Sequence, residues 1–123
     1  TVLGTVLVVK AKRDLSVRHT WAGYCLASAK FTTNGIYAYI RHPIYTGIYI
    51  LVIGSLFTVL PHLNLSLYLA LPAAALFSIL YVMGFLAFLA GKETEALLAR
   101  YGAAFQQYRD SVHPFLPLRK YSI

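Results

Sequence analysis

The chain has 123 residues, of which 59% are hydrophobic and 12% are charged, and its formal net charge is +7. A chain of this length indicates one folding unit, and so apolar a composition excludes an ordinary soluble domain. Such a positive charge is often typical of nucleic-acid binding, but the positions of the cations along the chain favour a membrane surface instead.

The first part of the chain is apolar and then becomes basic. Residues 1–9 form an apolar run about half as long as the roughly 20 residues that a spanning helix needs. We expect this run to be the end of a membrane helix that begins before Thr1, with a short interfacial segment as the alternative. Residues 10–42 mix cations with aromatic residues such as Trp21 and Tyr24, which is typical of the headgroup layer. These residues are predicted to form an interfacial segment.

The middle of the chain is long enough to cross a bilayer twice. No Lys, Arg, Asp or Glu occurs between His42 and Gly91, and about 20 apolar residues suffice for each helical pass. We predict an antiparallel pair of transmembrane helices over residues 43–60 and 65–89, joined by a turn at residues 61–64. The fold class is therefore expected to be an all-α integral membrane protein.

Proline and glycine positions predict how these two helices begin and pack. Pro43 suits the first turn of a helix, where its missing N–H is not needed. Gly47 and Gly54 share one face of the first helix, and Gly84 and Gly91 fall on one stripe of the second. Because small residues let membrane helices approach closely, both faces are expected to be packing surfaces.

Residues 92–109 are predicted to form an amphipathic helix on the cytoplasmic side. Glu93 lies on the apolar stripe of this helix, whereas Glu95 is turned about 200° away from it and faces water. Gly102 in mid-helix indicates either close packing or a break, since it costs roughly 1 kcal/mol relative to alanine. The apolar stripe consists of Leu97, Leu98, Tyr101, Phe105 and Tyr108.

The positions of the charges predict the orientation in the membrane. Six of the eleven Lys and Arg residues precede the predicted hairpin and five follow it, and none lies in its turn. By the positive-inside rule both flanks are cytoplasmic, where they meet anionic lipid headgroups, and no nucleic-acid partner is expected. Cys25 is the only cysteine, and the four histidines are scattered, so no disulfide and no metal site are predicted.

Polar and aromatic residues gather at the cytoplasmic ends of the two predicted helices. They lie at one depth because the helices leave from and return to the same face. Tyrosine rings attract cations, and a carboxylate can pair with an amine, so the group predicts a site for a small organic cation. Singly, each residue has a plainer interpretation, as a helix cap, a lipid anchor, an interfacial aromatic or a helix N-terminal charge. The group consists of Tyr37, Tyr39, Arg41, His42, Tyr45 and Glu93.

The spacing of these residues resembles a known family. Residues 33–47 read TNGIYAYIRHPIYTG and closely resemble the G-x-Y-x-x-x-R-H-P-x-Y-x-G signature of the integral-membrane methyltransferases. That superfamily includes isoprenylcysteine carboxyl methyltransferase and the phospholipid N-methyltransferases. Residues 93–108 resemble its second block, E-E-x-x-L-x-x-x-F-G-x-x-Y-x-x-Y, although Thr94 stands in place of the second glutamate and Phe105 in place of a tyrosine.

The resemblance implies methyl transfer from S-adenosyl-L-methionine at the cytoplasmic membrane face, by a one-step in-line displacement. The acceptor is expected to be lipid-like, or a carboxylate of the prenylcysteine type. Arg41, which would orient an anionic group, and Glu93 are the catalytic candidates. The cofactor-binding residues carried over are Tyr37, His42, Pro43, Tyr45, Gly47 and Glu93.

Two other functions remain open at this stage. One is an NADPH-dependent membrane oxidoreductase related to the sterol reductases. The C-terminal halves of those enzymes look similar to this chain. Those enzymes carry an arginine-aspartate-glutamate cluster that residues 91–95 lack. The other is a small non-catalytic membrane adaptor, for which the clustered polar residues would have no use.

Overall fold

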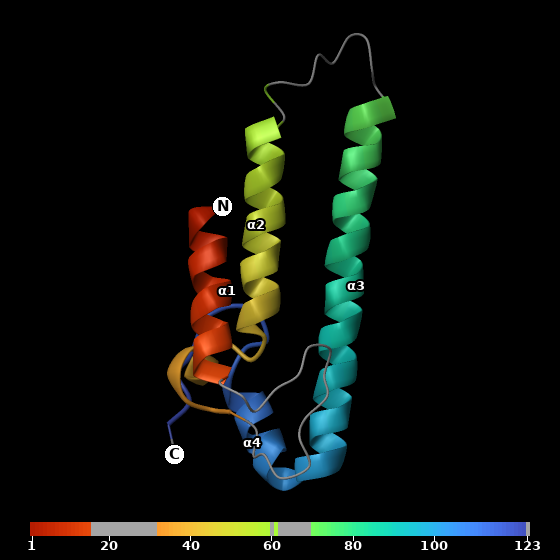
Figure 1. Cartoon of the computed structure of the whole chain (residues 1–123). Helices are drawn as coiled ribbons and strands as arrows, with labels where there is room; N and C mark the ends of the chain where they lie inside the picture. Colours follow the sequence, from red (N-terminus) through yellow and green to blue (C-terminus); the bar gives the residue numbers. More distant parts are fainter. Residues whose placement is uncertain (16–31, 60, 62–69, 123) are drawn as a thin grey trace.

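A computed structural model describes residues 1–15, 32–59, 61 and 70–122 (Figure 1). All the regular secondary structure of the described residues is helical, and the described C-terminal residues 112–122 form an irregular tail. The predicted interfacial residues 16–31 and most of the predicted turn at 61–64 lie outside the described residues. The elements in chain order are α1 (Val2–Leu15), the short 3-10 helix η2 (Gly35–Ala38), α2 (Pro43–Val59), α3 (Ala70–Tyr101) and α4 (Ala103–Ser111).

The helices run alternately along one long axis (Figure 1). α2 runs in the opposite direction to α1 and α3, and it lies between them. At the lower end of the molecule in this view, η2 and α4 meet the ends of the long helices. This arrangement brings the start of α2 and the end of α3 to the same end of the molecule, which is what a hairpin of two helices requires.

α1 and α2 approach each other backbone to backbone. A Cβ added to Gly4 would lie 2.7 Å from the carbonyl oxygen of Gly47, and one added to Gly47 would lie 2.9 Å from that of Gly4. α1 also continues through the first cations to Leu15, beyond the apolar run of residues 1–9. Ala11 and Leu15 are buried with Tyr37 and extend the packed face of α1.

α3 is one continuous helix of 32 residues, and the predicted interruption between residues 89 and 92 is wrong. Gly91 alone costs only roughly 1 kcal/mol in a helix, and good helix formers follow it. The break lies instead at Gly102, whose φ of 57° is unfavourable for residues with a Cβ. Among the described residues, a Cβ at Gly102 would meet nothing within 4 Å, and the positive φ alone favours glycine there.

The apolar stripe predicted for one helix over residues 92–109 is divided between α3 and α4, which meet at Gly102. Phe105, Tyr108 and Val112 are buried together, with residues of the last turns of α3 packed against them. The same side chains therefore do pack together, but they bridge α3 and α4. The partly buried members of this cluster are Leu97, Leu98, Tyr101 and Tyr121.

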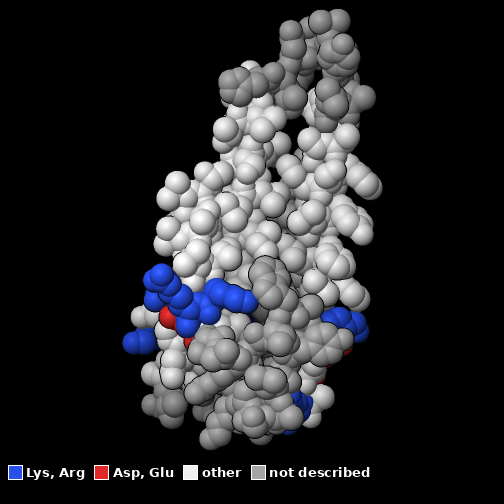
Figure 2. Space-filling view, viewed as in Figure 1, with Lys and Arg blue, Asp and Glu red and all other residues white. Residues whose placement is uncertain are grey.

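The apolar part of α3 is long enough to cross a bilayer. The stretch Pro72–Tyr101 meets the length and composition of a membrane span, and only 11% of its most apolar window is buried. A soluble core helix would be mostly covered, so this exposure favours lipid as the surrounding medium. α2 is shorter, with 17 residues, and its crossing stays a prediction. On the face drawn in Figure 2, the described Lys and Arg residues lie below a long surface that carries no charged side chains.

The small-residue stripe on α3 has no packing partner in the described part of the molecule. A Cβ added to Gly84 or Gly91 would meet nothing within 4 Å. The close approach predicted for the second helix is therefore not seen among the described residues, whereas that predicted for Gly47 is made against α1.

Candidate functional site

The turn into α2 is held by the C-terminal tail. The backbone N–H of Arg41 donates to the carbonyl of His113 (3.1 Å), and that of His42 donates to the carbonyl of Pro114 (2.9 Å). The Arg41 Nε donates to the carbonyl of Val112 at 2.8 Å. Thr46, one turn into α2, donates to the carbonyl of Phe115 at 3.0 Å. Four consecutive carbonyls of the tail thus fix the Arg-His-Pro junction, a contact that no local pattern in the sequence indicated.

A second support comes from the end of α1. The Ile36 N–H at the start of η2 donates to the Asp14 carboxylate at 2.8 Å, which satisfies a backbone donor at a helix start. Gly35 has a φ of 62°, and a Cβ there would overlap the Asp14 carboxylate. This explains physically why glycine opens the first block. Asp14 was not among the predicted site residues, and only its place beside the cations at residues 10–13 sets it apart in the sequence.

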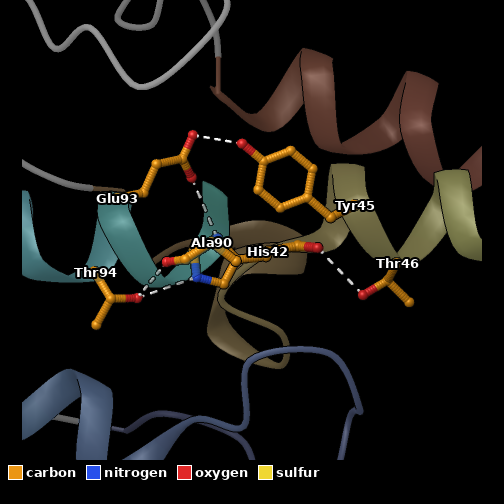
Figure 3. A network of polar contacts seen from close by, with 6 residues as sticks. All are labelled: His42, Tyr45, Thr46, Ala90, Glu93 and Thr94. Carbon is orange, nitrogen blue, oxygen red and sulfur yellow. Dashed lines mark hydrogen bonds and ion pairs between the residues drawn. The ribbon is translucent and has the colours of Figure 1, made fainter. Parts of the chain in front are cut away.

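Four side chains from α2, α3 and the residue preceding α2 form what we call the junction cluster: His42, Tyr45, Glu93 and Thr94 (Figure 3). The Tyr45 hydroxyl donates to Glu93 Oε1 at 2.6 Å. His42 Nδ1 lies 3.4 Å from Glu93 Oε2, and His42 Nε2 lies 3.3 Å from Thr94 Oγ1. The imidazole is also stacked on the Tyr45 ring, with centroids 5.6 Å apart. The cluster therefore joins the two sequence blocks directly.

The two glutamates of the second block lie in different surroundings, as their helical positions predict. The side chain of Glu93 is 23% exposed and contacts the junction cluster. The side chain of Glu95 is 71% exposed and pairs with Lys92 at 3.0 Å. Only Glu93 is placed where a ligand at the junction would meet it.

Tyr37 lies close to the cluster and is buried. Its pKa is raised, mainly by burial, and the charges of Tyr108, Glu93 and Asp14 add to the effect. The Tyr108 hydroxyl donates to the Tyr37 carbonyl at 2.6 Å, so α4 holds η2 in place. Burial likewise raises the pKa of Tyr108. Both phenols therefore stay protonated at neutral pH and can act as hydrogen-bond donors.

Phe115 places the tail against the same group. Its ring lies 6.0 Å from that of His42 and 5.4 Å from that of Tyr49. The Tyr49 hydroxyl in turn donates to the backbone carbonyl of Met83 on α3 at 3.0 Å. The tail and α3 thus both contact aromatic side chains of the first turns of α2.

Several residues expected at the site make other contacts in the structure. Gly47 faces α1, and Pro43 is fully buried as the first residue of α2. Tyr39 is exposed, with Lys120 5.8 Å from its ring centre. The Arg41 Nε is engaged by the tail, and burial lowers the pKa of this guanidinium. Gly47 and Pro43 therefore position α2, and Arg41 anchors the tail in the structure.

The comparisons with known proteins agree with the two blocks. The family model for phospholipid methyltransferases matches residues 1–104, which is most of the chain. The chain belongs to this family, whose members are membrane methyltransferases. No curated protein and no solved structure shows significant similarity to the chain. The tail that holds the Arg-His-Pro junction lies beyond the matched residues.

Proposed function

We propose that this protein transfers a methyl group from S-adenosyl-L-methionine to a lipid-borne acceptor at the cytoplasmic face of a membrane. Family membership supports methyl transfer over the oxidoreductase and the non-catalytic adaptor. The observation that carries the proposal is the junction cluster, in which His42 and Tyr45 of the first block contact Glu93 of the second.

The chemistry of the side chains fits this cofactor. Glu93 is partly exposed, and a carboxylate has about four lone-pair sites, so it can accept from an amino group or ribose hydroxyl as well as from Tyr45. The nearby tyrosine rings suit a sulfonium cation. Tyr37, His42, Tyr45 and Glu93 would hold the cofactor, which when bound supplies a methyl group already activated by its positive sulfur.

The residues of the chain would contribute orientation and exclusion of water. His42 and Tyr45 hold the Glu93 carboxylate from two sides, so its direction is set before a ligand arrives. The Phe115 ring and the tail cover the start of α2. Alignment of reacting groups in a dry site is the main requirement of a direct displacement.

Two acceptor classes remain to be separated. The family name points to a phospholipid, and the sequence resemblance also allows a prenylcysteine carboxylate. An amine must lose a proton on methylation, whereas a carboxylate need not. Incubation of the purified protein with labelled S-adenosylmethionine and a membrane extract, followed by identification of the labelled product, distinguishes the two.

Binding of the cofactor product tests the proposal itself. S-adenosylhomocysteine should raise the melting temperature of the detergent-solubilised protein, and NADPH should not. Glu93→Ala and His42→Ala should abolish the shift. Glu95→Ala is the matched control and should preserve it, because this side chain contacts Lys92 and not the cluster. Stabilisation by NADPH alone, or equal loss in Glu95→Ala, would refute the proposal.

A further inference from the structure

Thr94 occupies the position of the second glutamate in the family pattern, and in this chain its hydroxyl has two partners. Thr94 Oγ1 donates to the carbonyl of Ala90 at 2.8 Å, one turn earlier in α3. The same oxygen lies 3.3 Å from His42 Nε2 (Figure 3). His42 is only 8% exposed, so its ring nitrogens depend on protein partners.

The hydrogens of these groups can be counted. A hydroxyl has one proton, and the Ala90 carbonyl takes that of Thr94. Toward His42 the Thr94 oxygen can therefore only accept, which requires a proton on Nε2. Nδ1 then faces the Glu93 Oε2 at 3.4 Å.

We propose that Thr94 is a positioning residue that fixes the proton and the ring orientation of His42. With Nε2 directed to Thr94 and Nδ1 to Glu93, the imidazole anchors the carboxylate and does not serve as a general base toward an acceptor. The stacked Tyr45 ring and the Phe115 ring restrict rotation of the imidazole further. The consequence for methyl transfer rests on the proposed function, but the state of His42 does not.

Two substitutions separate the hydroxyl from the shape of the side chain. Thr94→Val keeps the branched side chain and removes the acceptor, whereas Thr94→Ser keeps the hydroxyl. In protein labelled with 15N-histidine in detergent, His42→Asn assigns the His42 signals. The Nε2–H of His42 should be protected from solvent exchange in the wild type and in Thr94→Ser. In Thr94→Val that protection should be lost and the Nε2 chemical shift should change.

Affinity for S-adenosylhomocysteine provides the second measurement. Loss of one hydrogen bond should weaken binding about three- to tenfold in Thr94→Val, and Thr94→Ser should bind as the wild type does. If the His42 signals respond as expected but even the wild type binds no S-adenosylhomocysteine, the proposed function fails and the role of Thr94 stands. An Nε2 signal unchanged in Thr94→Val overturns the inference, whatever the binding result.

Discussion

The two faces of α2 are held in different ways. Toward α1 the contact is between backbones, and added Cβ atoms at Gly4 and Gly47 would collide with the partner helix. Toward α3 the contact is made by polar side chains, namely Tyr45 and His42 with Glu93, and Tyr49 with Met83. Among the described residues, nothing lies within 4 Å of a Cβ added to Gly84 or Gly91 of α3. The first face positions α2 against α1, and the second carries the junction cluster.

Leucine substitutions at Gly47 of α2 and Gly84 of α3 should differ most in their effect on the free energy of unfolding. Gly47→Leu should lower the free energy of unfolding by about 1–3 kcal/mol, because the new side chain must displace Val8 and the backbone at Gly4. Gly84→Leu is the matched control on α3, where a Cβ would meet no described residue within 4 Å, and it should change the free energy of unfolding by less than about 0.5 kcal/mol. Thermal and denaturant unfolding in detergent measure both. Equal losses would contradict the contrast.

A smaller loss is expected at the contact between α1 and η2. Gly35→Ala should cost about 1–2 kcal/mol from its positive φ, with a further loss from overlap with Asp14. Asp14→Ala combined with Gly35→Ala should relieve the overlap but not the backbone strain. The double variant should therefore lose less than the sum of the single variants, as a cycle of unfolding measurements will show. Strict additivity would mean that the two residues do not touch.

Alkaline pH should weaken the contact of α4 with η2. Burial raises the pKa of Tyr108 in the folded protein, and the pKa in the unfolded chain is about 10. The stability contributed by this protonated phenol is therefore complete below about pH 10 and is lost as the pH rises above it. Tyr108→Phe should cost about 1 kcal/mol at neutral pH and should flatten the decline in stability above about pH 10. Parallel decline in both proteins would rule out this origin.

The smallest effect is expected from a single hydroxyl between α2 and α3. Tyr49→Phe removes the hydrogen bond to the Met83 carbonyl, and such bonds in membrane proteins contribute about 0.6 kcal/mol on average. The melting temperature should fall slightly, while affinity for S-adenosylhomocysteine should stay within about twofold of the wild type. A loss as large as that of Gly47→Leu would show that the side-chain bridges, and not the backbone contact, hold α2 in place.

The local parts of the fold could be predicted from the sequence. Pro43 begins α2 because a first-turn proline loses no hydrogen bond. Glu93 and Glu95 differ in exposure because helical rotation separates them. The shared face of Gly47 and Gly54 predicted a packing surface on α2, and the structure places Gly47 against α1.

The parts that failed depend on contacts between distant segments. α3 continues from Leu89 to Tyr101. The residues around Leu89 did not indicate this, because a glycine such as Gly91 weakens a helix and is compatible with either a break or a continuous helix. The pairing of the Arg41 junction with residues 112–115 joins positions about 70 residues apart. No periodicity or short motif records such a contact, and the same is true of Asp14 and η2.

The most direct test of the junction cluster is a double-mutant cycle between Tyr45→Phe and Glu93→Gln, read out as affinity for S-adenosylhomocysteine. The hydroxyl and the carboxylate lie 2.6 Å apart, and hydrogen bonds to charged groups contribute about 1.5–3 kcal/mol. We expect a coupling energy of at least about 1 kcal/mol, with the double variant binding little worse than Glu93→Gln alone. Additive effects within about 0.3 kcal/mol would contradict a site shared by α2 and α3.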